Sequence, residues 1–441
     1  MGTTNRGLRS AILTGLAMVP MPVLAWDIDW GLGLGFEYSD NLGRRTLDPI
    51  SGNTISPFFD IEATEEGDSL RANIVGSFRY DYYAGDAGDE FSPNFVANLG
   101  ANVVWELQPE RWLWTLDNYA SQQPIDPFAT EAPDNVQNTN VFATGPTFLY
   151  RFSEAMSGRT EVRYVNSYAD EDDSFNSNRF EFDGRMLRDL SELTTISANG
   201  SVELVNLSNP TPTAPDFSRY SLYGGYDWRS TRTTLRADLG WNWVDFDDLD
   251  SRDGLLARLI ATVAVTPIST FDAAFEHRLS DTATDFASAV PDANSLLLPG
   301  SVSTISGAST ITSDVYQLDR LDVGYTRTGQ RVALRLGGYG SDQDYETNPA
   351  LSQRNHGALA TIDYSISALA TFGVFGVTDW QDFTESDVES RESAYGLRFT
   401  YRVLRNLDLG MEATRADRSS DLPDDDFDEN RIYVAVTWRS E

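Results

Sequence analysis

The strongest constraint on the fold is a strict alternation of apolar and polar residues near the start of the chain. The positions between the apolar residues of the stretch WDIDWGLGLGFEYSDN, at residues 26–41, hold glycine, aspartate or glutamate. Side chains of a β-strand point alternately to opposite faces, so a period of two predicts a strand with one apolar face. The apolar residues at every second position are Ile28, Trp30, Leu32, Leu34, Phe36 and Tyr38.

The same alternation recurs along the whole chain. A tilted strand needs about ten residues to cross the hydrocarbon core of a membrane, and the runs are about that long. We predict an all-β fold, a transmembrane antiparallel up-and-down β-barrel of about 20 strands, with about 18 as the alternative. The further runs cover residues 70–82, 95–105, 162–168, 180–186, 196–204, 220–228, 235–243, 255–265, 332–336, 358–364, 370–380, 395–401, 407–413 and 432–438.

The segments between the runs alternate in length, which favours a barrel. Short connectors such as QPER, RSTR, TPIS and TGQR alternate with long ones such as SDNLGRRTLDPISGN and NLSNPTPTAPDF. Outer-membrane barrels have tight turns on the periplasmic side and longer loops outside. An open sheet in lipid would leave unpaired backbone groups at its edges, at about several kcal/mol each, so we expect the sheet to close.

The first residues of the chain have the features of an export signal. Arg6 and Arg9 precede an uncharged apolar run that ends at Ala25. We therefore expect a secretory signal peptide at residues 1–25 and an outer-membrane β-barrel at residues 26–441. The apolar run is shorter than the about 20 residues of a membrane-spanning helix. The expected location is the cell outer membrane of a Gram-negative bacterium, which the chain would enter through the barrel-assembly machinery.

Composition limits the classes of function. The 441 residues carry a formal net charge of −34, and every basic residue apart from the histidines is arginine. A polyanion repels nucleic acid, so we expect no nucleic acid among the partners. Because cysteine is absent, the chain can form neither disulfides nor thiolate metal sites. A hydrophobic fraction of 41% is ordinary for a soluble protein, but a barrel with lipid-facing residues at alternate positions has the same average.

The rows that alternate with the apolar residues should face the lumen, and they carry charges of both signs. A lumen of one sign would indicate ion selectivity, whereas a mixed lumen leaves two alternatives. The charges form either a lattice of salt bridges that stiffens a wide barrel or a transverse field that orients polar solutes. The pore-lining candidates are Arg71, Arg79, Arg159, Arg163, Arg179, Arg185, Arg219, Arg236, Arg258, Arg335, Asp183 and Asp238.

The longest connector, at residues 281–314, is poor in charge and rich in Ser, Thr and Ala. The first strand begins close to the expected cleavage site, so we expect no plug domain ahead of the barrel, and any occlusion must come from loops. This connector either folds inward as a constriction or covers the surface. Few aromatic residues fall on the expected inner rows, namely Tyr223, Tyr339 and Phe375, and so few do not indicate a slide for glycans.

We expect neither an enzyme nor a cofactor. The two histidines, His277 and His356, continue apolar rows and should face lipid near the outer rim, away from any lumen partner for acid–base catalysis. Acidic clusters at residues 170–173, 245–253 and 424–429 do not match the ligand spacing of a calcium loop. We expect solvated loops there, with the bridging of divalent cations to lipopolysaccharide phosphates as the alternative.

Short motifs in the chain resemble the outer-membrane β-barrel porin family. They are GLGLGFEYSDNLGR, with its Asp40-Asn41 pair, DNYASQQPIDPFATEAPDNVQNTNVFATGP at residues 117–146, and YRVLRNLDLGMEATRADRSS leading into ENRIYVAVTW. The similarity of pattern extends over the chain after residue 25. The resemblance implies an outer-membrane pore or an accessory to export, and some members of this family accompany exopolysaccharide biosynthesis loci.

These features together predict an outer-membrane porin or channel that passes hydrophilic solutes, with polysaccharide among the candidates. The alternatives are a non-conducting accessory barrel of an exopolysaccharide export system and an outer-membrane hydrolase. The expected partners are outer-membrane lipids and lipopolysaccharide, the barrel-assembly machinery, and a polysaccharide or a small polar solute.

Overall fold

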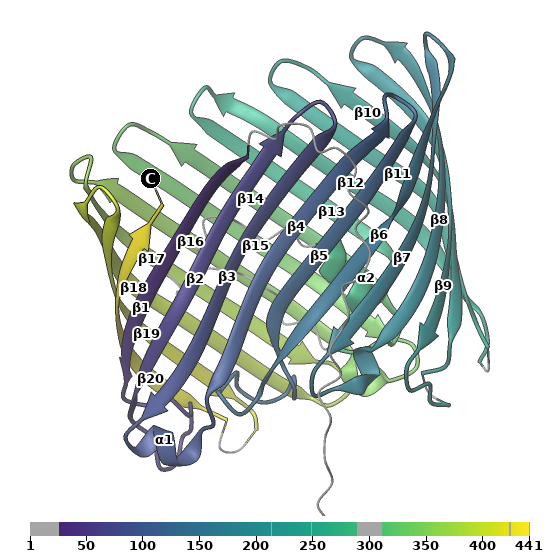
Figure 1. Cartoon of the computed structure of the whole chain (residues 1–441). Helices are drawn as coiled ribbons and strands as arrows, with labels where there is room; N and C mark the ends of the chain where they lie inside the picture. Colours follow the sequence, from purple (N-terminus) through teal and green to yellow (C-terminus); the bar gives the residue numbers. More distant parts are fainter. Residues whose placement is uncertain (1–25, 213, 248, 289–310, 423–424, 441) are drawn as a thin grey trace, which may run out of the picture.

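The chain forms one closed barrel (Figure 1). The computed structural model describes residues 26–212, 214–247, 249–288, 311–422 and 425–440. A single antiparallel sheet contains 20 strands, and consecutive strands pair with each other. The sheet closes because β1 (Asp27–Ser39) pairs with β20 (Phe427–Arg439) as well as with β2. The predicted barrel of about 20 strands is confirmed.

The strands are longer than the about ten residues that the hydrocarbon core requires. They range from 12 to 18 residues, so their ends extend beyond the membrane. The remaining strands are β2 (Gly52–Glu66), β3 (Leu70–Ala84), β4 (Asn94–Gln108), β5 (Trp112–Pro124), β6 (Val136–Ser153), β7 (Met156–Ala169), β8 (Ser177–Ser191), β9 (Thr194–Leu207), β10 (Phe217–Arg229), β11 (Thr233–Phe246), β12 (Arg252–Thr266), β13 (Ser269–Ser280), β14 (Tyr316–Thr328), β15 (Val332–Tyr345), β16 (Gln353–Ser365), β17 (Ala370–Phe383), β18 (Val388–Leu404) and β19 (Leu407–Ser420).

Five strands, β2, β5, β6, β13 and β14, lie outside the predicted runs. In β2 the buried Phe58 is followed by the outward-facing Phe59, so adjacent aromatic residues hide the period of two. In β6 the pairing with β7 is interrupted at Gly145 and Pro146. There the guanidinium group of Arg163 donates to the two freed carbonyl oxygens, at 3.1 and 2.9 Å. A side chain thus replaces the missing backbone bonds, as a buried ladder requires.

The two ends of the barrel differ in the length of their connectors. Short turns, such as the one between β8 and β9, lie at the upper end in Figure 1, where β1 begins and β20 ends. The longer connectors lie at the lower end, with α1 (Asp86–Glu90) among them. Short turns mark the periplasmic end of an outer-membrane barrel, so the lower end in Figure 1 is the extracellular end.

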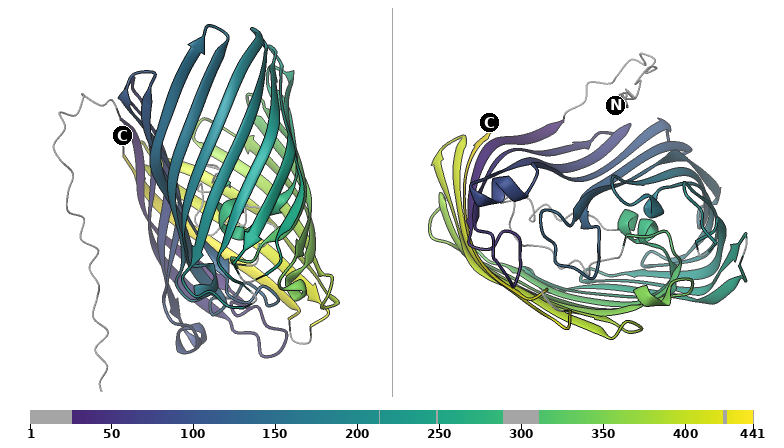
Figure 2. Two further views of the ribbon diagram at one scale, coloured as in Figure 1. Left: turned by 90° about the vertical axis from the view of Figure 1, so that its right-hand side faces the viewer. Right: turned by 90° about the horizontal axis from the view of Figure 1, so that it is seen from below.

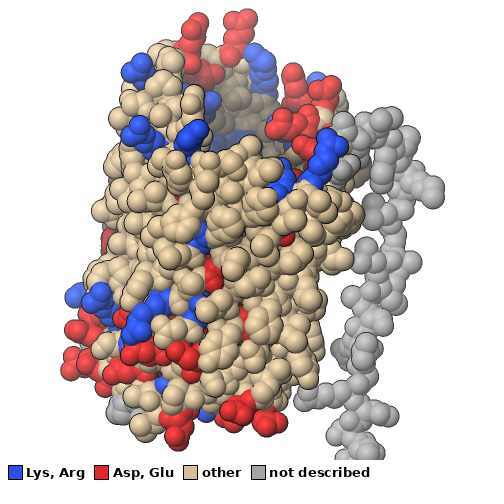
Figure 3. Space-filling view, turned by 90° about the vertical axis from the view of Figure 1, so that its left-hand side faces the viewer, with Lys and Arg blue, Asp and Glu red and all other residues tan. Residues whose placement is uncertain are grey.

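The outer face is apolar between two charged rims. On the side shown in Figure 3, charged side chains gather mainly at the two ends, and a broad band with few charges separates them. Aromatic residues pack on one another near the rims, as in Trp30 with Trp438, at 5.0 Å between ring centroids, and Tyr220 with Trp243, at 5.6 Å. An exposed apolar band on a closed sheet requires lipid around it. The chain is therefore an outer-membrane barrel.

Helices are few and short in the described residues. Two turns of 3-10 helix, η1 (Asp173–Phe175) and η3 (Pro349–Leu351), lie in connectors at the extracellular end. The helix α2 (Thr282–Ser288) follows β13 and lies inside the barrel (Figure 2). None of the helices in the described ranges is long and apolar enough to cross a membrane.

Candidate functional site

The twelve predicted pore-lining residues all lie on inward-facing rows of the wall. In β8, for example, Arg179, Asp183 and Arg185 alternate with the exposed, outward-facing Phe180 and Phe182. A role in lining a conducting path stays a prediction. The other nine are Arg71 and Arg79 in β3, Arg159 and Arg163 in β7, Arg219 in β10, Arg236 and Asp238 in β11, Arg258 in β12, and Arg335 in β15.

Many of these residues form ion pairs across neighbouring inward rows. Arg258 lies 3.2 Å and Arg236 lies 3.5 Å from the carboxylate of Asp238. Arg79 lies 2.8 Å from the carboxylate of Asp81. Of these three pairs, the one between Arg258 of β12 and Asp238 of β11 connects adjacent strands, whereas the other two each lie within one strand. For these parts of the wall, the ion pairs favour a lattice of salt bridges over a transverse field that orients polar solutes.

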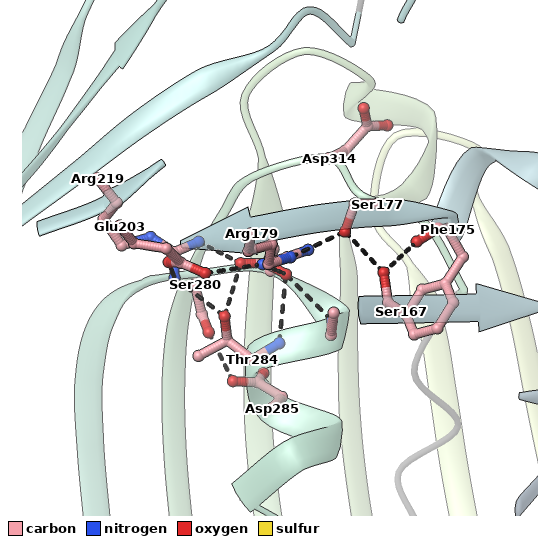
Figure 4. Close-up of polar contacts among 12 residues, drawn as sticks. Ser167, Phe175, Ser177, Arg179, Glu203, Arg219, Ser280, Thr284, Asp285 and Asp314 are labelled. Carbon is pink, nitrogen blue, oxygen red and sulfur yellow. Dashed lines mark hydrogen bonds and ion pairs between the residues drawn. The ribbon is translucent and has the colours of Figure 1, made fainter. Parts of the chain in front are cut away.

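Four charged side chains form a closed group where the wall meets a segment that enters the lumen (Figure 4). Asp281, directly after β13, is paired with Arg179 of β8, at 2.8 Å, and with Arg219 of β10. Glu203 of β9 lies 3.1 Å from each arginine. The hydroxyl of Thr284 donates to Asp281 at 2.8 Å. We call Arg179, Glu203, Arg219 and Asp281 the Asp281 cluster. Its charges balance, which is the condition for burying ions at a tolerable cost.

The Asp281 cluster fixes the charge of its central carboxylate. Burial alone would raise the pKa of Asp281, but the guanidinium groups of Arg179 and Arg219 outweigh burial and hold that pKa well below its usual range. Asp281 therefore remains ionised at neutral and mildly acidic pH. Without Asp281 the two buried arginines would share the single carboxylate of Glu203, and one positive charge would remain uncompensated, so the cluster stabilises the segment only as a complete set.

The segment after Asp281 folds into the barrel. Ala283, in α2, and Ile311, near the start of β14, pack on Val141 of the inner wall of β6. Both ends of the segment thus reach from β13 and β14 towards β6 and β7, and Figure 2 shows α2 within the lumen. The described parts of the longest connector, residues 281–288 and 311–314, fold into the barrel, which was one of the two predicted alternatives. Residues 289–310 of that connector lie outside the described residues.

A second connector, between β5 and β6, also reaches across the lumen. Phe128 packs on Phe383 of β17, with ring centroids 4.2 Å apart. The carbonyl oxygen of Phe128 accepts a hydrogen bond from Arg418 of β19 at 2.9 Å. The backbone N–H of Thr130 donates to Asp425, in the connector between β19 and β20, at 3.1 Å. Sequence reasoning missed this crossing, because neither the periodicity nor the charge of a loop shows which distant strands it will contact.

The Asp40-Asn41 pair, part of the motif on which the predicted resemblance rests, closes the seam between β1 and β20. Asp40 accepts two hydrogen bonds from Asn430, one from its backbone N–H and one from its side-chain amide, both at 2.7 Å. The amide of Asn41 donates to the carbonyl oxygen of Arg45 at 2.9 Å and shapes the following loop. The pair has a structural role at the extracellular end of the closing strands.

Two of the three predicted inner aromatics lie against the wall instead of projecting into the lumen. Tyr339 is opposite Gly357, and Phe375 is opposite Gly396, in the neighbouring strands. A Cβ atom added at Gly357 would lie 2.5 Å from the Tyr339 ring, and one at Gly396 would lie 2.7 Å from the Phe375 ring. Each ring occupies the space into which a side chain at the opposite glycine would project. The third, Tyr223, borders a hollow in the wall, with Arg258 above its ring at 5.1 Å.

A hollow of about 300 Å³ lies against the inner wall between β5 and β10. Polar and charged side chains dominate its lining, and six strands contribute to it, so no local sequence motif could have indicated it. The residues that matter for its chemistry are Tyr119, Arg159, Glu161, Asp183, Arg185 and Tyr223. The hollow adjoins the Asp281 cluster, because Arg179 lies on the same inward row of β8 as Asp183 and Arg185. It is the strongest candidate for a functional site.

The histidines lie on the outer face, on the rows where the sequence placed them. Nδ1 of His277 lies 2.6 Å from a carboxylate oxygen of Asp319, on the neighbouring strand β14. The ring of His356 stacks on that of Trp380, with centroids 4.9 Å apart. Neither histidine borders the hollow. The structure therefore brings no imidazole to the lumen charges in the part of the chain that it describes.

The acidic connectors use several of their carboxylates as structural acceptors. Asp172 caps η1 by accepting the N–H of Ser174, and Asp253 accepts the indole N–H of Trp241 at 2.8 Å. Within the described residues, no three His, Asp or Glu side chains are grouped so that they could hold a metal ion. Binding of divalent cations at these connectors stays a prediction.

Comparison with known proteins finds similarity of structure alone. No protein-family model matches the sequence, and no curated protein matches it. The ferric enterobactin receptor of Pseudomonas aeruginosa is 10% identical over 94% of this chain and 80% of its own, with a TM-score of 0.47. For the FrpB iron transporter of Neisseria meningitidis the identity is 10%, over 93% and 81%, with a TM-score of 0.46. For the siderophore receptor PirA of Pseudomonas aeruginosa it is 11%, over 94% and 80%, with a TM-score of 0.44.

Similarity at this level concerns the fold and says nothing of the ligand. The broad part of the predicted resemblance, an outer-membrane β-barrel, is confirmed by the closed sheet itself. The narrower part, membership of the porin family with its link to exopolysaccharide loci, stays a prediction.

Proposed function

We propose that this chain is an outer-membrane pore that admits small hydrophilic solutes and performs no chemistry on them. The observation that carries the proposal is the polar inner wall, where charges of both signs surround a hollow of about 300 Å³. Apolar side chains face outward and polar side chains face inward, as a water-filled lumen requires.

Small solutes fit this lumen better than a polysaccharide chain does. The Asp281 cluster holds one segment inside the barrel, and Phe128 anchors a second on the wall of β17 and β19. Polysaccharide passage would need an open path and aromatic platforms for successive sugar rings. The aromatic residues Tyr339 and Phe375 instead lie in the spaces above glycines, with only 7% and 5% of their surfaces exposed.

The second candidate function is a non-conducting accessory barrel. The same two crossings favour it, because segments anchored on opposite walls narrow the lumen at its extracellular end. The link of such an accessory to exopolysaccharide export rests on the family resemblance alone.

Swelling of liposomes separates these candidates. The refolded chain would be placed in vesicles and exposed to isotonic glycine, sucrose or a large dextran. The proposed pore predicts rapid swelling with glycine, slower swelling with sucrose and none with dextran. No swelling with any solute would establish the non-conducting barrel. Swelling with dextran would show that the pore is wide enough to pass a polysaccharide.

A further inference from the structure

The hollow in the wall of β5 to β10 contains charges that face like charges. Arg159 of β7 is directly opposite Arg185 of β8, and one row further towards the extracellular end Glu161 is directly opposite Asp183. Like charges directly opposite each other in a sheet are destabilising. If Arg159 and Glu161 exchanged places, each would be opposite a residue of the other charge on β8, so the observed order costs stability. Sites that bind ligands commonly depart from stabilising rules in this way.

One strand, β8, presents charges of both signs without oppositely charged partners, and two of its carboxyl groups, Glu181 and Asp183, lie within hydrogen-bond reach of each other. Within 4 Å, the ion-pair limit, neither Asp183 nor Arg185 meets an opposite charge among the residues that the structure describes, and the same holds for Glu181. Their neighbours are paired: Glu161 with Arg163 at 2.7 Å, and Arg179 within the Asp281 cluster. Among the described charged residues that line the hollow, these three groups of β8 and Asp117, which accepts a hydrogen bond from Asn102, lack an oppositely charged partner.

We propose that this hollow binds a small zwitterion, an amino acid or a short peptide with free ends. Asp183 and Glu181 would receive the ammonium group, and Arg185 would bind the carboxylate, for which the fork of a guanidinium is well suited. Inward residues two apart on a strand are separated by about 7 Å, which is compatible with the two ends of a dipeptide. The proposal rests on the proposed pore and names the class of solute that the pore prefers.

Other lining groups suit such a solute. Asn199 lies opposite Arg185 on β9; its amide nitrogen donates to Ser197 and to the carbonyl oxygen of Tyr223, which leaves its side-chain oxygen as a free acceptor for an N–H group of the solute. Tyr119 and Tyr223 approach from β5 and β10, on the two sides of the hollow. A volume of about 300 Å³ is at the small end of the range for ligand pockets, which suits a small solute. The hollow is thus a short dipolar site in an otherwise neutralised wall.

Binding can be measured by calorimetry on the refolded full chain in detergent, with three probes. Glycylglycine carries both charges, N-acetyl-glycylglycine lacks the ammonium group, and glycylglycine amide lacks the carboxylate. We expect glycylglycine to bind about tenfold more tightly than either blocked form, because each loses one charge-assisted interaction. Equal binding of all three probes, or no binding of glycylglycine at millimolar concentration, would overturn the proposal.

Two variants assign the ends of the solute. Asp183→Asn should weaken glycylglycine to the level of the N-acetyl form, and Arg185→Gln should weaken it to the level of the amide. Arg188→Gln is the matched control, because Arg188 lies on the outward row of the same strand and should leave binding unchanged. A loss of affinity in Arg188→Gln equal to that in Arg185→Gln would contradict the assignment. Binding to a barrel that conducts nothing would leave this inference standing and remove the pore, so the two failures are distinguishable.

Discussion

The ring of Phe58 covers Gly33 on the inner wall: a Cβ atom added at Gly33 would lie 2.1 Å from Cζ of Phe58. The two residues are directly opposite in β1 and β2. Tyr433 covers Gly35 in the same way from β20, where an added Cβ would lie 2.4 Å from its hydroxyl oxygen. The glycines that alternate with the apolar residues of β1 therefore leave room for aromatic rings at the seam where the barrel closes.

Replacing Gly33 by alanine should destabilise the barrel. The methyl group would overlap the Phe58 ring, and overpacking of this kind costs about 1–3 kcal/mol. The measurement is the temperature at which the folded, fast-migrating band disappears in electrophoresis of heated samples. The control is Gly324→Ala on the inner wall of β14, where an added Cβ would meet only Asp272 at 4.0 Å. A Gly33→Ala barrel as heat-resistant as the control would contradict the packing argument.

Replacing Arg179 by glutamine should release the segment that enters the lumen. The substitution breaks a buried ion pair with Asp281, and removing one partner of such a pair costs about 3–5 kcal/mol. Hydrogen exchange in α2 should become much faster, while exchange in the strands stays slow. Arg188→Gln, on the opposite face of β8, should leave α2 protected. Unchanged protection of α2 in Arg179→Gln would show that the Asp281 cluster does not hold the segment.

The inward segment should loosen as pH rises through the raised pKa of Asp314. Burial raises the pKa of Asp314, so the stability from its protonated form is present below its unfolded pKa and lost as pH rises through the folded pKa. Asp281 has the opposite sign: its lowered pKa keeps its contribution until the pH falls far below the usual range.

The pH dependence can be assigned with one variant. Asp314→Asn should make the protection of residues 311–315 nearly independent of pH between about 4 and 8, because the titrating group is gone. Hydrogen exchange corrected for the intrinsic rate at each pH gives this protection. The same loss of protection on raising the pH in the variant and in the unchanged chain would show that another group titrates.

Replacing Phe128 by alanine should free the connector between β5 and β6. The substitution removes the contact with Phe383 and leaves the backbone hydrogen bonds of residue 128 with Arg418 and of Thr130 with Asp425 as links to the far wall. Truncation of a large aromatic contact costs about 3–5 kcal/mol when it is fully buried, and less here. Limited proteolysis within residues 125–135 should become faster. Ile125→Ala in the same connector is the control, since Ile125 is exposed, and equal cleavage of both variants would contradict the anchor.

The sequence was enough to predict the barrel, because alternation decides which face of every strand meets lipid. It placed Asp183 and Arg185 on the lumen side and His277 on the lipid side, as the structure shows. Strands such as β2 and β6 escaped notice where adjacent aromatic residues or Gly145 and Pro146 broke the period.

The contacts inside the lumen could not be predicted in the same way. Thr130 and its acceptor Asp425 are 295 residues apart in the chain, and Arg219 and Asp281 are 62 apart. Such pairs follow from the curvature of the closed sheet and from the path of each loop, which no local pattern records. The arginine and aspartate residues of the Asp281 cluster could be recognised as charged, but their common meeting point could not.

The most direct test of the account is single-channel conductance of the refolded chain in a planar bilayer, compared with the double variant Arg179→Gln, Arg219→Gln. The account predicts small, discrete conductance steps for the unchanged chain and larger steps for the double variant, because the inward segment is released from the wall. Arg188→Gln should conduct like the unchanged chain. Silence in a correctly folded chain and in its double variant would contradict the account, since the lumen would then be no path for solutes.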